Sequence, residues 1–123
     1  MKSLLLLIGL IGYTSASELK VSSQMNCSVD VNVNTQYCEN QTMTETITFQ
    51  EGKPYFIDNI GTMISVYTIN KTVIFDKNGD GTDDYFVMSV TSEANNRYIA
   101  TFDMNNKIIT MSANGFIIIK KID

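Results

Sequence analysis

The stretch of sequence with the most evident chemistry is residues 76–84, Asp-Lys-Asn-Gly-Asp-Gly-Thr-Asp-Asp. Hard cations such as Ca²⁺ take six to eight oxygen ligands at flexible distances, and a glycine at position 6 lets such a loop turn sharply. Without a cation, each close pair of carboxylates repels by about 1 kcal/mol even in water. The spacing therefore predicts a structural Ca²⁺ site. Its donors recur at positions 1, 3, 5, 7 and 9, namely Asp76, Asn78, Asp80, Thr82 (through its backbone carbonyl) and Asp84.

Two alternatives for this loop stay open. Asn, Gly and Asp are also the residues that form tight turns, so the stretch could be a solvated hairpin loop, and Mg²⁺ could replace Ca²⁺. If Ca²⁺ binds, we expect a Kd of about 10⁻⁴ to 10⁻³ M, as in extracellular modules.

The loop differs from an EF-hand, which has a bidentate Glu at position 12 and helices on both sides. Position 12 is Val87, position 8 is the charged Asp83, and apolar, strand-like runs flank the loop. The loop resembles instead the D-x-[DN]-x-D-G-x-x-D calcium loops of FG-GAP and VCBS repeats. The matching residues are Asp76, Asn78, Asp80, Gly81 and Asp84. The resemblance covers only the loop and its flanks, so it implies a cation loop between two β-strands and no family fold.

Alternating apolar and polar residues predict the elements that hold this loop. This period of two is typical of half-buried strands, and turn signals follow every 8–12 residues. No segment has helical periodicity. We expect a small all-β antiparallel meander of eight or nine strands, closed as a barrel or folded as a two-layer sandwich. The predicted strands cover residues 29–33, 43–49, 55–57, 62–69, 72–75, 85–91, 97–102, 107–111 and 116–121.

The N-terminus has the pattern of a secretory signal peptide. Lys2 precedes an apolar run at 4–11, and small residues follow at 14–17. We predict cleavage after Ala16, with Ser17 as the second choice. The run is shorter than the about 20 residues that span a bilayer. We therefore expect a signal peptide at 1–16, a single domain at 17–123, export to the periplasm or the medium, and no stable membrane insertion after cleavage.

Both cysteines, Cys27 and Cys38, would then lie in an oxidising compartment, where disulfides persist. A Cys27–Cys38 disulfide is the predicted arrangement. The alternatives are a redox pair and half of a zinc site. Their spacing is not CxxC, and the chain has no histidine to complete a zinc shell.

Charge and composition exclude several classes of function. Of nine basic residues Lys2 leaves with the signal, so eight face thirteen acidic ones, and four of these acids lie in 76–84. No basic cluster is present for nucleic acid. Without histidine, Ser-His-Asp and Cys-His catalysis are excluded. Five acidic residues could in principle supply the carboxylate pair of a hydrolase. We expect their side chains to be solvated, however, and therefore predict that the protein is not an enzyme. The candidates are Glu45, Glu51, Asp58, Glu93 and Asp103.

Two functions are consistent with these observations. The first is a small exported binding or structural module, disulfide-stapled, with a Ca²⁺-stabilised hairpin, whose partner is an unknown protein or surface ligand. The second is an exported inhibitor or accessory protein that inserts a loop into a partner enzyme. In size, single disulfide and meander the chain resembles periplasmic lysozyme inhibitors, although both cysteines lie in its N-terminal third.

Overall fold

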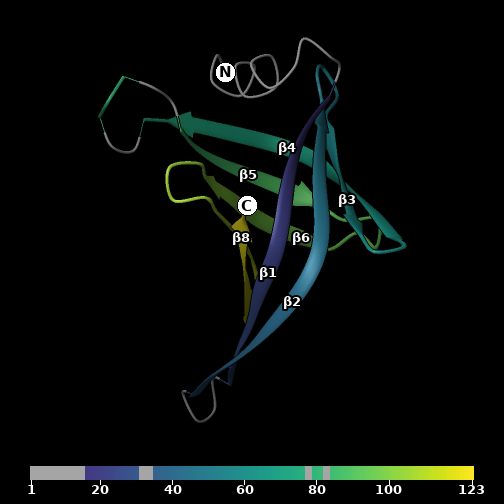
Figure 1. The fold of residues 1–123 in the computed structure, drawn as a ribbon, viewed down its shortest axis with the longest axis vertical. Coiled ribbons are helices and arrows are strands. Elements are labelled where there is room, and N and C mark those ends of the chain that lie inside the picture. Colours follow the sequence, from purple (N-terminus) through teal and green to yellow (C-terminus); the bar gives the residue numbers. More distant parts are fainter. Residues whose placement is uncertain (1–15, 31–34, 77–78, 82–83) are drawn as a thin grey trace.

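Eight antiparallel strands form a closed barrel in the computed structural model, which describes residues 16–30, 35–76, 79–81 and 84–123. Each strand pairs with its neighbours in sequence, and β1 pairs with β8 to close the sheet (Figure 1). The all-β meander is therefore confirmed, and the barrel is the correct one of its two predicted architectures. The strands are β1 (Ala16–Asp30), β2 (Thr35–Gln50), β3 (Tyr55–Ile60), β4 (Met63–Phe75), β5 (Tyr85–Thr91), β6 (Arg97–Asp103), β7 (Ile108–Ala113) and β8 (Phe116–Ile122).

The turn expected at Asn70 and Lys71 is absent, because β4 continues through both residues. Its pairing with β5 shifts register between Ile69 and Lys71, which indicates a β-bulge. The Asn70 side chain donates a hydrogen bond of 2.7 Å to the Thr91 hydroxyl. A bulge places polar residues in the middle of a strand, and this is why the sequence pattern suggested two strands where there is one.

The first strand begins much earlier than predicted. β1 starts at Ala16, whereas alternation predicted a strand only at 29–33, of which residues 31–33 lie outside the described part of the chain. Alternation did not reveal the start of β1 because polar residues, Gln24 and Asn26, lie on its inner face as well as on its outer face. The predicted signal peptide lies outside the described residues except for Ala16. Within the described ranges, no helix is long and apolar enough to cross a membrane.

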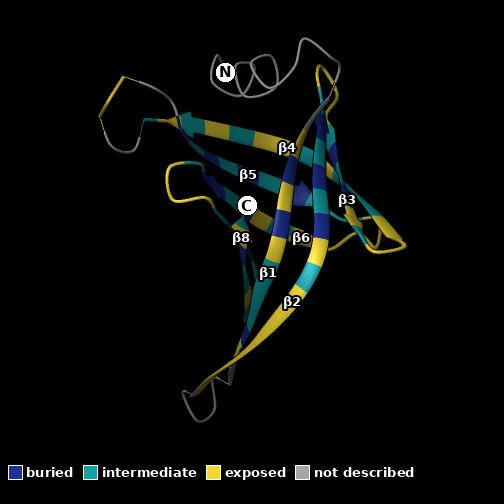
Figure 2. Ribbon diagram, viewed as in Figure 1, coloured by how far each residue is buried: buried dark blue, intermediate teal, exposed yellow. Residues whose placement is uncertain are grey.

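Alternate residues of the strands fill the barrel (Figure 2). In β5, Phe86 and Met88 point inward and are at most 1% exposed. Three rings meet at the centre: Phe49 lies 5.3 Å from Phe56 and 5.5 Å from Phe102, measured between ring centroids. Such aromatic pairs add about 0.5–1.5 kcal/mol each beyond the area they bury. The core is thus a packed aromatic cluster.

The meander divides the connections between two ends of the barrel. The β2–β3, β4–β5 and β6–β7 connections lie at one end, called here the acidic-loop end, and the four others lie at the opposite, mouth end. At the mouth end β1 and β2 form a long ribbon (Figure 1), along which β2 extends past β3 and β8 pairs with β1 as far as Ser28. β3 pairs with β2 only from Glu45 to Phe49, so the earlier part of β2 pairs with β1 alone.

Candidate metal centre

The acidic loop is closed at its base by strand pairing. Phe75, the last residue of β4, pairs with Tyr85, the first of β5, and their ring centroids are 5.0 Å apart. The Asp84 amide donates to the Phe75 carbonyl at 3.4 Å. This pairing holds Asp76 and Asp84, the first and last residues of the predicted site, at the same end of the hairpin.

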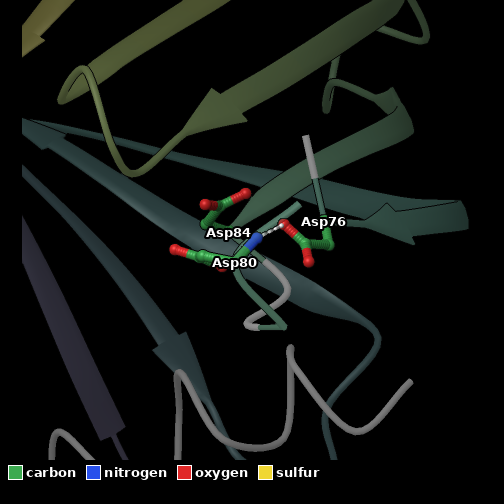
Figure 3. Close-up of side chains that lie close together, drawn as sticks. All are labelled: Asp76, Asp80 and Asp84. Atoms are coloured by element: carbon green, nitrogen blue, oxygen red, sulfur yellow. Dashed lines mark hydrogen bonds between the residues drawn. The ribbon is translucent and has the colours of Figure 1, made fainter. Parts of the chain in front are cut away.

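Three carboxylates converge in this loop (Figure 3). Asp76, Asp80 and Asp84 each present an oxygen, and these three oxygens all lie within 4.8 Å of one another. Two ligands on opposite sides of a Ca²⁺ ion are about 4.6–5.2 Å apart, because each lies about 2.3–2.6 Å from it. The oxygens are therefore close enough to share one ion.

The loop wraps around the Asp76 carboxylate. Its Oδ1 accepts hydrogen bonds from the amides of Gly79 (2.8 Å) and Asp80 (3.2 Å), and its Oδ2 accepts one from Gly81 (2.6 Å). Gly79 and Gly81 have positive φ angles of 75° and 86°, a backbone conformation that would be strained for a residue with a side chain. Desolvation raises the pKa of Asp76, but the amides of Gly81, Gly79 and Asp80 outweigh it, so the pKa lies below its ordinary value. Asp76 is therefore an anion at neutral pH.

Asp84 is the buried member of the three, with 6% of its surface exposed. Its Oδ2 accepts a hydrogen bond from the side-chain amide of Asn105, and its carbonyl accepts one from the Met104 amide at 3.0 Å. Asn105 and Met104 belong to the β6–β7 turn. The Asp103 carboxylate stabilises the same turn by accepting bonds from the Asn106 amide (3.1 Å) and side chain (2.9 Å). Asp84 thus ties the acidic loop to a second hairpin.

The structure brings together three of the five predicted ligands. Asn78 and Thr82 lie outside the described residues. One oxygen from each of the three carboxylates falls short of the six to eight that Ca²⁺ takes, so the carbonyls, waters or bidentate contacts common in such sites would complete the shell. The donor set is all oxygen and highly anionic, which fits a hard divalent cation and not a thiolate- or imidazole-seeking metal.

Cys27 and Cys38 form a disulfide, as predicted. They lie directly opposite each other in the β1–β2 ribbon, with their Cα atoms 4.1 Å apart. The disulfide therefore joins the two strands where they extend past β3 at the mouth end.

A second charged cluster lies inside the barrel. Glu45, Asp58 and Lys120 are 1%, 4% and 3% exposed. The Lys120 ammonium donates to both Glu45 carboxylate oxygens, at 2.8 and 2.7 Å, and to Gln24 Oε1 at 3.0 Å. The expectation that Glu45, Asp58 and Asp103 are solvated is therefore wrong, since all three are buried. A residue on the core-facing side of an alternating strand is buried whatever its polarity, and Glu45 shares its face with Ile47 and Phe49.

Asp58 is the unusual member of this cluster. Burial is the main cause that raises its pKa to about 8; a hydrogen bond and the charge of Glu45 add to the rise, and Lys120 opposes it. Among the described residues Asp58 Oδ1 has no hydrogen-bond partner. Burial, and next the charge of Asp58, also raise the pKa of Tyr67 to about 12. At neutral pH, then, Asp58 keeps its proton and lies beside the ion pair of Glu45 and Lys120.

The alternation of its strand indicates that Glu45 faces the core. No local sequence pattern indicates that Asp58 and Lys120 lie next to it. They lie on β3 and β8, and Lys120 is 75 residues away from Glu45 in sequence.

Comparison with known proteins returns no match: no protein family, curated protein or solved structure shows significant similarity to this chain. The geometry of the residues therefore carries the functional argument.

Proposed function

We propose that this protein is a small exported all-β module whose β4–β5 loop binds Ca²⁺. The observation that supports this most is the convergence of Asp76, Asp80 and Asp84, whose oxygens lie within 4.8 Å of one another. The Cys27–Cys38 disulfide supports export, because such bonds persist in oxidising compartments.

The role of the ion is structural. Asp76 and Asp80 lie on the loop, whereas Asp84 is buried and bonded to the β6–β7 turn. An ion held by all three would fasten the loop to the barrel and relieve the repulsion between the carboxylates. With a Kd of about 10⁻⁴ to 10⁻³ M, the site would fill at the millimolar Ca²⁺ of an extracellular medium.

Thermal unfolding of the mature protein tests the proposal. Ca²⁺ at ten times Kd should stabilise the fold by about 1.4 kcal/mol, which raises Tm by about 6 °C for a domain of this size. Asp80→Asn should abolish the rise. Glu51→Gln removes one negative charge from an exposed turn and should leave it unchanged. Equal melting temperatures in Ca²⁺ and in chelator would refute the proposal.

A second candidate function is inhibition or regulation of a partner enzyme by loop insertion. One observation favours it: the neighbouring apolar residues Met63 and Ile64, beside the β3–β4 turn, are 70% and 64% exposed, and contiguous exposed apolar surface is a place where a partner protein can bind. An enzyme captured by the protein from its extracellular or periplasmic extract should lose activity when the protein is added. Met63→Ser with Ile64→Ser should prevent this. Unchanged inhibition by that variant would exclude the turn as the inserting loop.

A further inference from the structure

A pocket lies at the mouth end, opposite the acidic loop, and its volume is about 650 Å³. Pockets that hold small molecules measure about 300–1,000 Å³. The β1–β2 ribbon and the start of β8 form it, and the disulfide borders it. Eight residues line this mouth pocket: the two disulfide cysteines and six others, which are Asn26, Ser28, Tyr37, Glu39, Phe116 and Ile118.

Strand register places these six side chains on one face. Ser28 pairs with Phe116 on one side and Tyr37 on the other, and Asn26 pairs likewise with Ile118 and Glu39. Residues directly opposite in paired strands point to the same side of a sheet. The next row is Lys120, Gln24 and Gln41, and Lys120 is buried inside the barrel. The mouth pocket is thus an outward continuation of the barrel interior.

Two aromatic rings form part of the pocket wall. The Phe116 ring lies 6.0 Å from Tyr98, which in turn lies 6.0 Å from Tyr67. Phe116 is therefore held by a row of aromatic rings that leads to the core. Tyr37, across the pocket, is 58% exposed. Tyr37 and Phe116 thus line the pocket from two sides, and aromatic rings of this kind attract cations.

The lining of the pocket carries one carboxylate, that of Glu39. Lys120, the nearest cation on this face, is neutralised by the two bonds to Glu45. Gln24 connects the pocket to the buried charged cluster, since its side chain donates a hydrogen bond to Asn26 Oδ1 at 2.8 Å and accepts one from Lys120. Lys121 points to the opposite face because it follows Lys120 in the strand.

We propose that the mouth pocket binds a small organic cation with an apolar or aromatic body. Glu39 pairs with the cationic group, and Tyr37 and Phe116 contact the body. Ser28 and Asn26 supply hydrogen-bonding groups beside it. This site is separate from the Ca²⁺ loop and does not depend on it.

Amide NMR titration of the oxidised protein in chelator tests the proposal without Ca²⁺. The probes are 2-phenylethylammonium, the neutral 2-phenylethanol of nearly equal shape, and the anion 3-phenylpropionate. The ammonium should cause saturable shifts at residues 26–28, 37–39 and 116–118. It should bind about threefold to fivefold more tightly than the alcohol, as expected for one exposed charge pair, and the anion should not bind.

Variants separate charge from shape. Glu39→Gln should reduce the affinity for the ammonium to that for the alcohol, whereas Glu51→Gln, which removes the same charge at the other end, should not change it. Ser28→Phe, at an exposed position, should block both probes by filling the pocket. Shifts elsewhere in the barrel, no saturation, or equal binding of ammonium and alcohol would overturn the proposal. The native amide spectrum of each variant confirms its fold.

Discussion

Replacing Asp58 with Asn should remove a steep pH dependence of the protein's stability. Asp58 is buried beside Glu45, and its pKa is raised to about 8 by burial first and Glu45 second. The groups that face it are the Glu45 carboxylate, the Lys120 ammonium and the Tyr67 phenol. An Asn side chain has the shape of the protonated carboxyl and can donate the same hydrogen bond to Glu45, but it does not titrate.

The sign follows from proton binding. In the folded protein Asp58 keeps its proton up to about pH 8, whereas in the unfolded chain it loses the proton near its ordinary pKa of 3.8. Between these values the folded state binds one proton more, so the free energy of unfolding falls by about 1.4 kcal/mol per pH unit as pH rises. From pH 5 to pH 7 the loss is about 3 kcal/mol.

Urea unfolding of the wild-type and Asp58→Asn proteins at pH 5, 6 and 7 measures this effect. The variant should gain stability relative to the wild type at each step, by up to about 1.4 kcal/mol per unit. Glu51→Gln, which changes an exposed carboxylate, should follow the wild type. A constant difference between wild type and Asp58→Asn across this range would refute the raised pKa of Asp58.

Three further predictions concern other supports of the barrel. Replacing Cys27 and Cys38 with Ser should lower the urea-derived free energy of unfolding by about 3 kcal/mol through the lost loop constraint; equal stability of oxidised wild type and variant would contradict this. Lys120→Met leaves Glu45 without its buried counter-ion and should cost about 3–5 kcal/mol in the same assay, and a loss below 1 kcal/mol would show that the pair is hydrated. Gly81→Ala places a Cβ at φ 86°, which should cost about 1–2 kcal/mol and weaken Ca²⁺ binding in a calorimetric titration; unchanged affinity would show that the loop tolerates another backbone.

The strands were largely predictable because alternation is a local pattern. β5 and β6 were found within a residue of their observed bounds, since their buried faces are apolar without interruption. β1 was missed because much of its inner face is polar. Closure of the barrel depends on pairing between β1 and β8, the two strands most distant in sequence, and no local pattern encodes it.

The two charged clusters differ in how far they could be predicted from the sequence, again because one is local and the other is not. Asp76, Asp80 and Asp84 lie within nine residues, so their spacing alone suggested a shared ligand, and the structure brings them together. Glu45, Asp58 and Lys120 come from three strands and meet only when the barrel closes. Alternation marks Glu45 as core-facing in its own strand, but nothing in β3 or β8 indicates that Asp58 and Lys120 lie beside it. The mouth pocket depends likewise on the register between β8, β1 and β2.

Anomalous diffraction from crystals grown in Ca²⁺ tests the central claim most directly. The account predicts one anomalous peak in the β4–β5 loop, about 2.3–2.6 Å from oxygens of Asp76, Asp80 and Asp84 together. Crystals of Asp80→Asn grown in the same solution serve as the control, and their peak should be absent or much weaker. No peak at 10 mM Ca²⁺, well above the expected Kd, or a peak that touches only one of the three carboxylates would contradict a structural Ca²⁺ site.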